Sequence, residues 1–132
     1  MNSMEKKDIV TFWKTEAEDS KRVAWHLFEK KDFSYALFFG HLAIEKIIKA
    51  IYVKNIGVNI PRSHNLPRLA KVAGIIVPEE IIPALIRITG FNIESRYPDY
   101  KKKFRDKCTS QFTKNELEKI DKVFIWLKSI LS

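Results

Sequence analysis

The stretch from Phe33 to Asn55, FSYALFFGHLAIEKIIKAIYVKN, constrains the fold more than any other part of the sequence. Its apolar side chains would project in nearly every direction around a helix of 3.6 residues per turn. A helix that is apolar almost all round is buried on most of its sides. The stretch does not predict a membrane span, because charged residues interrupt it. We therefore expect it to form the central helix of a larger helical fold.

One polar stripe interrupts this predicted central helix. His41, Glu45 and Lys49 are spaced four residues apart, so their side chains stack along one face, and Ser34 and the Tyr52 hydroxyl extend the stripe. We call these five residues the polar seam. Glu45 precedes Lys49 in the orientation that favours an intrahelical ion pair, which contributes about 0.2–0.5 kcal/mol. The seam could face solvent, a partner or a ligand.

Periodic patterns predict a helix before this central one. Apolar residues spaced by three and four indicate an amphipathic helix from about Met4 to Lys30. The connection at Lys31 and Asp32 is short, with Asp32 as the expected N-cap of the central helix. So short a connection predicts that the first two helices form an antiparallel hairpin.

The rest of the chain predicts three more helices. A loop over residues 55–63 leads to a short helix over residues 64–74, with Ser63 or Asn65 as its cap. A fourth helix is expected from about Pro78 to Glu94 and a loop over residues 95–100, because a residue that precedes proline disfavours helix. The basic run 101–107 is not assigned to a helix.

The last helix has the clearest predicted start. Thr113 followed by Glu116 matches a capping box, and apolar residues then recur at helical spacing. No stretch alternates with the period of two that a strand requires. The predicted fold is all-α: one domain over residues 1–132, an up-and-down bundle of about five helices, four long and one short and inserted.

The net charge of +8 is unevenly distributed. Residues 61–112 carry ten Lys and Arg against five Asp and Glu. This excess is compatible with a basic patch for nucleic acid or nucleotide. It is equally compatible with a solvated surface that confers solubility.

Other chemistry is largely excluded. The three histidines and one cysteine lack zinc-ligand spacing, and His41 with Glu45 supplies only two ligands, so we expect no metal site and no cofactor. No glycine-rich phosphate loop and no nucleophile elbow are present. The single cysteine, Cys108, cannot form an internal disulfide and fits a reducing compartment. The first residues lack an apolar signal core, so we expect a cytoplasmic protein that does not interact with a membrane.

Three blocks, in this order, resemble the HEPN (higher eukaryotes and prokaryotes nucleotide-binding) family, of the prokaryotic stand-alone type. They are AIEKIIKA at residues 43–50, IP and SHNL within residues 60–66, and ESRYPDY at residues 94–100. The resemblance covers essentially the whole chain. It implies a small helical bundle that forms homodimers and acts with a minimal nucleotidyltransferase in a toxin–antitoxin-like pair.

Many members of the family are metal-independent ribonucleases marked by an arginine followed, after four to six residues, by a histidine. The corresponding positions upstream of His26, His41 and His64 hold no arginine, and no histidine follows Arg96. The resemblance therefore implies the non-nuclease branch.

Three hypotheses follow for the function. The first is a non-catalytic module that binds a nucleotide, RNA or a nucleotidyltransferase partner. The second is a divergent ribonuclease that uses His41 or His64 with Arg96. The third is a helical adaptor whose seam serves dimerisation. The candidate residues for binding or for the dimer seam are His41, Glu45, Lys46, Lys49, His64, Arg96, Tyr97 and Tyr100.

Overall fold

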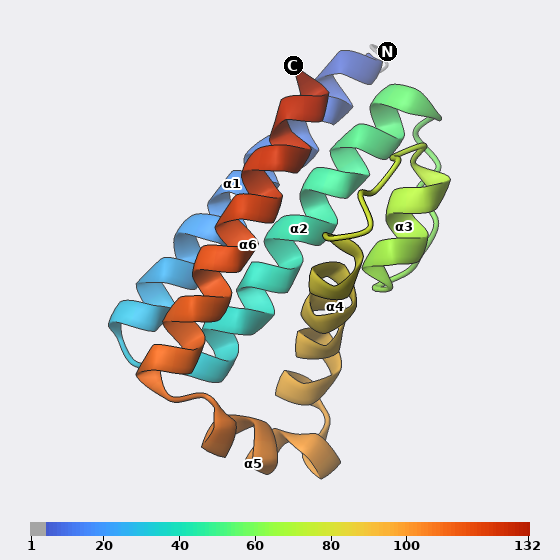
Figure 1. Cartoon of the computed structure of the whole chain (residues 1–132). Helices are drawn as coiled ribbons and strands as arrows, with labels where there is room; N and C mark the ends of the chain where they lie inside the picture. Colours follow the sequence, from blue (N-terminus) through green and yellow to red (C-terminus); the bar gives the residue numbers. More distant parts are fainter. Residues whose placement is uncertain (1–4) are drawn as a thin grey trace.

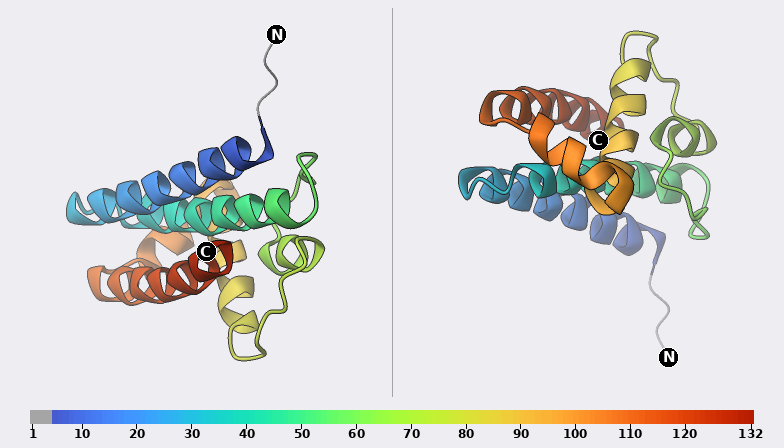
Figure 2. Two further views of the ribbon diagram at one scale, coloured as in Figure 1. Left: turned by 90° about the horizontal axis from the view of Figure 1, so that it is seen from above. Right: turned by 90° about the horizontal axis from the view of Figure 1, so that it is seen from below.

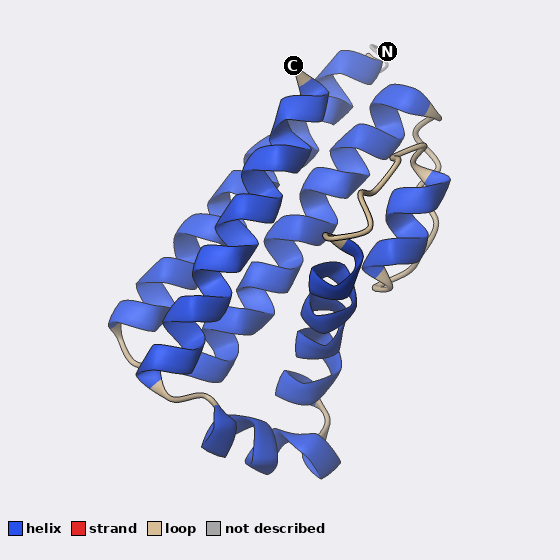
Figure 3. Ribbon diagram, in the orientation of Figure 1, coloured by secondary structure: helices blue, strands red, loops and turns tan. Residues whose placement is uncertain are grey.

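Six helices and their connections form the computed structural model, which describes residues 5–132. Residues 5–132 contain no strand (Figure 3). The helices are α1 (Lys6–Glu29), α2 (Phe33–Asn55), α3 (Leu66–Val72), α4 (Ile82–Arg96), α5 (Pro98–Lys107) and α6 (Ser110–Leu131). The all-α fold predicted from the sequence is confirmed, with one helix more than expected.

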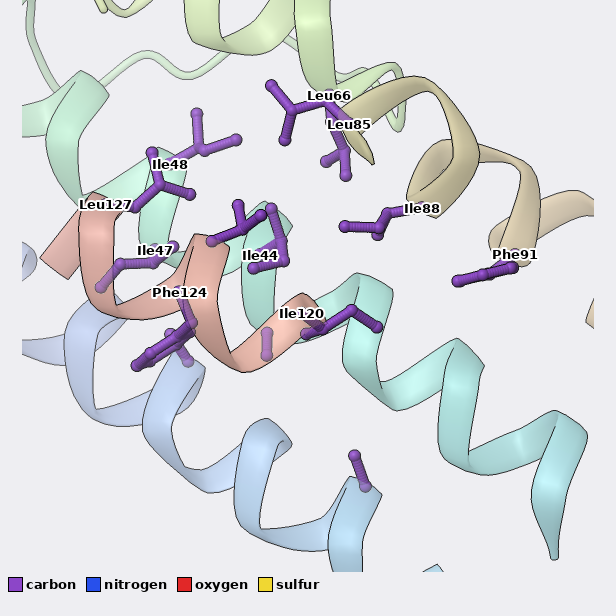
Figure 4. Packing of buried hydrophobic residues seen from close by; sticks show 14 of the residues in the cluster. Ile44, Ile47, Ile48, Leu66, Leu85, Ile88, Phe91, Ile120, Phe124 and Leu127 are labelled. Atoms are coloured by element: carbon purple, nitrogen blue, oxygen red, sulfur yellow. The ribbon is translucent and has the colours of Figure 1, made fainter. Parts of the chain in front are cut away.

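The helix α2 occupies the centre of the bundle, as its sequence predicts, and it contacts every other helix (Figure 1). Helices α1 and α6 lie along it, as the views from above and below also show (Figure 2). Its isoleucines at 44, 47 and 48 have no exposed surface and pack with residues of α4 and α6 (Figure 4). Burying each such side chain contributes about 1.5–3 kcal/mol. Gly40 lets α6 come close, because a Cβ at this position would lie 2.6 Å from Ile120 Cδ1.

The hairpin between α1 and α2 is confirmed. Lys31 adopts a positive φ of 66°, which turns the chain sharply between the two helices. Asp32 holds the predicted N-cap position of α2, although its side chain makes no capping hydrogen bond. The predicted start of the first helix at Met4 lies outside the described residues, within which α1 begins at Lys6.

The short inserted helix follows the predicted pattern closely. Asn65 is the N-cap of α3, and its Oδ1 accepts a hydrogen bond of 3.1 Å from the Arg68 amide. Gly74, with φ of +80°, follows the end of the helix in the left-handed conformation that glycine adopts without strain. The expected start at His64 was two residues too early, because His64 and Asn65 lie before the first helical turn.

The predicted loop over residues 95–100 is wrong. Helix α4 continues to Arg96 and α5 begins at Pro98, so Tyr97 alone is extended between them, with φ of −85° and ψ of 130°. Proline forces the preceding residue out of the helical region but is itself well accommodated in the first turn of the next helix. The expected start of α4 at Pro78 was also too early, since residues 78–81 form a turn and the helix begins at Ile82.

The predicted capping box at Thr113 is also wrong. Thr109 is the N-cap of α6, and its hydroxyl accepts a 3.1 Å hydrogen bond from the Phe112 amide. Thr113 lies inside the helix, fully buried, and its hydroxyl donates to the Thr109 carbonyl at 2.8 Å. Among residues 5–132, none of the helices combines the length and the apolar composition that crossing a bilayer requires.

Candidate functional site

The polar seam is organised around one buried carboxylate. Only 4% of the Glu45 side chain is exposed, yet it lies beside three basic groups. His64 Nδ1 lies 2.7 Å and His41 Nε2 lies 3.3 Å from Oε1, and Lys49 Nζ lies 3.1 Å from Oε2. The predicted ion pair between Glu45 and Lys49 is therefore confirmed. We call these four residues the Glu45 cluster.

The partners of Glu45 keep it ionised. Burial by itself would raise the pKa of this carboxyl group. The hydrogen bonds from His41 and His64 and the charge of Lys49 outweigh burial and lower the pKa of Glu45 from 4.5 to about 2. A buried carboxylate is tolerated only where such partners compensate for its lost hydration.

The second nitrogen of His41 is also occupied. Its Nδ1 lies 3.2 Å from the backbone carbonyl oxygen of Ile88 in α4, and its side chain has no exposed surface. A carbonyl oxygen can only accept, so Nδ1 must carry a proton for this hydrogen bond to form. Nε2 faces the Glu45 carboxylate at 3.3 Å, and a proton on this nitrogen gives the hydrogen bond that helps to lower the pKa of Glu45.

The seam faces other parts of the same chain. Lys49 Nζ lies 4.9 Å from the centroid of the Trp13 ring in α1. Lys46 donates a 2.9 Å hydrogen bond to Ser20, also in α1. His64, in the segment before α3, is the most exposed member of the cluster, with 59% of its side chain exposed. The polar seam, together with Lys46 and His64, thus contacts α1, α4 and the segment before α3.

The remaining sequence candidates lie elsewhere, where α4 meets α5. The Arg96 side chain donates to the backbone and side-chain oxygens of Asn92, and its guanidinium carbon lies 5.7 Å from the ring centroids of Phe38 and Tyr97. Within the described residues Arg96 forms no hydrogen bond with a histidine. Tyr97 and Tyr100 are each about half exposed. The structure therefore separates the candidates into two groups.

Sequence reasoning missed three residues beside this second group. Arg105 in α5 donates a 3.2 Å hydrogen bond to the Tyr35 hydroxyl in α2, and Lys101 Nζ lies 5.5 Å from the centroid of that ring. Hydrogen bonds and charge from these two cations lower the pKa of Tyr35. The basic run 101–107 was a visible signal, but its helical structure and its contact with Tyr35 were not.

We call Tyr35, Arg96, Tyr97, Tyr100, Lys101 and Arg105 together the α5 surface. Within the described residues, none of the lysines and arginines of α5 forms an ion pair with a carboxylate. Beside this surface lies a hollow of about 270 Å³, whose lining includes Lys31, Ser34, Tyr35 and Arg105. Cations, exposed aromatic rings and a recess therefore lie together.

Known proteins place the chain in a family. It is similar in structure to TT1696 from Thermus thermophilus, with a TM-score of 0.79, 20% sequence identity, and coverage of 92% of this chain and 97% of that chain. At this identity the likeness concerns the fold alone. No curated protein matches the sequence. The model of the HEPN domain matches residues 10–130, nearly the whole chain, and the protein belongs to the HEPN family.

Proposed function

We propose that this HEPN protein is a non-catalytic module that binds single-stranded RNA through the α5 surface. The observation that carries the proposal is a group of cations that, among the described residues, have no carboxylate partner and lie beside half-exposed tyrosines. Lysine and arginine attract the phosphate backbone, and aromatic rings stack on unpaired bases at about 1–3 kcal/mol per base. The hollow beside Tyr35 and Arg105 offers a recess in which a nucleotide could lie against both a cation and a ring.

The contacts of Arg96 support a binding role over catalysis. A ribonuclease centre needs a cation to stabilise the phosphate and a histidine to transfer protons, both within reach of one phosphodiester. Arg96 is held by Asn92 and two aromatic rings. The two histidines of the Glu45 cluster lie against Glu45. The sequence also lacks the arginine–histidine spacing of the nuclease members.

The experiment measures the binding of a labelled single strand of about 12 nucleotides, a length in the range of single-strand sites, by fluorescence anisotropy. The Lys101→Ala/Arg105→Ala double variant removes two cations from the α5 surface. Lys114→Ala/Lys122→Ala on α6 removes the same charge from exposed positions that form no ion pair within residues 5–132. We expect the α5 variant to bind at least about tenfold more weakly, and its salt-dependence slope to fall by about 1.4.

The α6 control variant is expected to bind nearly as the parent protein does. Absence of binding by the parent protein, or equal loss in both double variants, would refute recognition by the α5 surface. The same RNA is recovered after incubation and sized. Cleavage by the parent protein would refute the non-catalytic proposal and favour the ribonuclease alternative.

We also propose that the protein forms a homodimer and acts with a minimal nucleotidyltransferase, as the family resemblance implies. The exposure of apolar side chains on α4 supports a surface for protein contact, since Ile82, Ile86 and Ile93 are 37%, 60% and 45% exposed. Light scattering tests the dimer: a mass near 15.5 kDa at all concentrations would refute it. Co-expression with a minimal nucleotidyltransferase tests the partner, and failure to co-purify would contradict it.

A further inference from the structure

We propose that His41, Glu45 and His64 form a binding site for a divalent metal ion, and that Zn²⁺ is the ion that this donor set favours. Each residue offers one donor atom, and the three atoms lie within 4.8 Å of one another. Two imidazole nitrogens with one carboxylate oxygen are a recurrent protein ligand set for zinc, in which solvent or another ligand fills the fourth position. The site is independent of the proposed RNA binding.

The geometry of His41 also suits a metal ligand. Its Nδ1 donates to the Ile88 carbonyl, which leaves Nε2 as the ring nitrogen available to a metal ion. Metal-bound histidines commonly donate their other ring nitrogen to a backbone carbonyl in this way. Nε2 lies 3.3 Å from Glu45 Oε1, so a metal ion that replaces the proton between the two atoms would be bound by both.

Binding of a metal ion requires the donors to rearrange, since the three atoms lie up to 4.8 Å from one another. Ligands bound at about 2.0–2.1 Å in a tetrahedron lie somewhat more than 3 Å apart. The contact between His41 Nε2 and Glu45 Oε1 already has this length, whereas the 2.7 Å contact with His64 Nδ1 must lengthen. His64 belongs to the segment before α3, outside the helices, and 59% of its side chain is exposed. Its movement would open the site and provide a path for the ion.

Lys49 does not occupy the proposed metal position. Its ammonium group contacts Oε2 of Glu45, while both histidines contact Oε1. The carboxylate can therefore keep Lys49 on one oxygen and use the other for the metal. The nearby positive charge lowers the affinity for a cation, so Lys49→Met is expected to bind Zn²⁺ more tightly than the parent protein.

The test uses the untagged full-length protein after metal removal. Zn²⁺ affinity is measured by competition with a chromophoric chelator, and Co²⁺ is added as a spectroscopic probe. We expect one ion per chain and a visible absorption spectrum typical of tetrahedral Co²⁺. His64→Ala is expected to weaken Zn²⁺ binding by at least about tenfold, whereas His26→Ala, which removes an exposed histidine of α1, leaves it unchanged.

Circular dichroism establishes that each variant is folded. If the parent protein binds no Zn²⁺, or if His64→Ala binds it as tightly as His26→Ala does, the cluster is an ion-pair network only and the proposal is overturned. The anisotropy assay is run on the same variants without metal. RNA binding unchanged by His64→Ala would separate the outcome of this test from that of the proposed function.

Discussion

Glu45→Gln is the most informative single perturbation of the fold. The substitution keeps the size and shape of the side chain and removes its charge. His41, His64 and Lys49 would then share a neutral amide in place of a carboxylate. Breaking a buried charge arrangement by neutralising one member is strongly destabilising, because the other charges lose their compensation.

The magnitude follows from the pKa of Glu45. Its decrease from 4.5 to about 2 corresponds to roughly 3 kcal/mol of stability. With only 4% of the side chain exposed, solvent screening reduces this value little. Since glutamine can still form part of the hydrogen bonding, we expect a loss of about 2–3 kcal/mol in the free energy of unfolding. This corresponds to a decrease of roughly 10 °C in Tm for a chain of this length.

The effect has a defined pH dependence. The folded-state pKa is lower than the unfolded one, so the contribution is fully present above the unfolded value of 4.5 and is lost as the pH falls toward about 2. The difference between Glu45→Gln and the parent protein should therefore be largest near neutral pH. It should fall to roughly half at about pH 3.

The assay is urea unfolding followed by far-UV circular dichroism, with a chelator present so that metal binding does not contribute. Glu18→Gln is the matched control, because Glu18 pairs with Lys128 at 3.7 Å on the surface, where both side chains are more than 40% exposed. Such a pair contributes about 0–1 kcal/mol. A Glu45→Gln loss no greater than that of the control would show that the cluster does not stabilise the fold.

Two further predictions concern the segment that joins α5 to α6. Burial, together with the charge of Glu94, raises the pKa of the Cys108 thiol to about 11. A disulfide reagent at mildly alkaline pH should therefore modify Cys108 far more slowly in the folded protein than in urea. Equal rates of modification would contradict this prediction. Thr109→Ala should lower the free energy of unfolding by about 1 kcal/mol through loss of the α6 cap, whereas Gln111→Ala, at an exposed position in the same turn, should have a smaller effect. Urea unfolding measures both variants, and equal losses would rule out the cap at Thr109.

The starts of α3 and α6 show which helix caps the sequence could and could not predict. Asn65 was one of two predicted caps and is the cap that α3 uses. At α6, by contrast, Thr109 and Thr113 are both plausible caps four residues apart, and local sequence favoured the wrong one. Burial decided the outcome, because Thr113 has no exposed surface and packs inside the bundle.

The sequence by itself determined the central helix and part of the seam. The apolar character of Phe33–Asn55 on all sides required a buried helix, and the structure places α2 over the same residues. The contact between Glu45 and Lys49 followed from helical spacing alone, since residues four apart lie on one face. Such local relations are fixed by the geometry of a single helix.

Only the tertiary structure decided what the seam faces. His64 is 19 residues from Glu45, and the Ile88 carbonyl is 47 residues from His41. No periodicity relates positions on different helices, so the third candidate ligand of the proposed metal site could not be found from spacing. The same holds for Tyr35 and Arg105, 70 residues apart, which meet because α5 packs against the start of α2. Helix packing, which depends on the whole core, brings these side chains together.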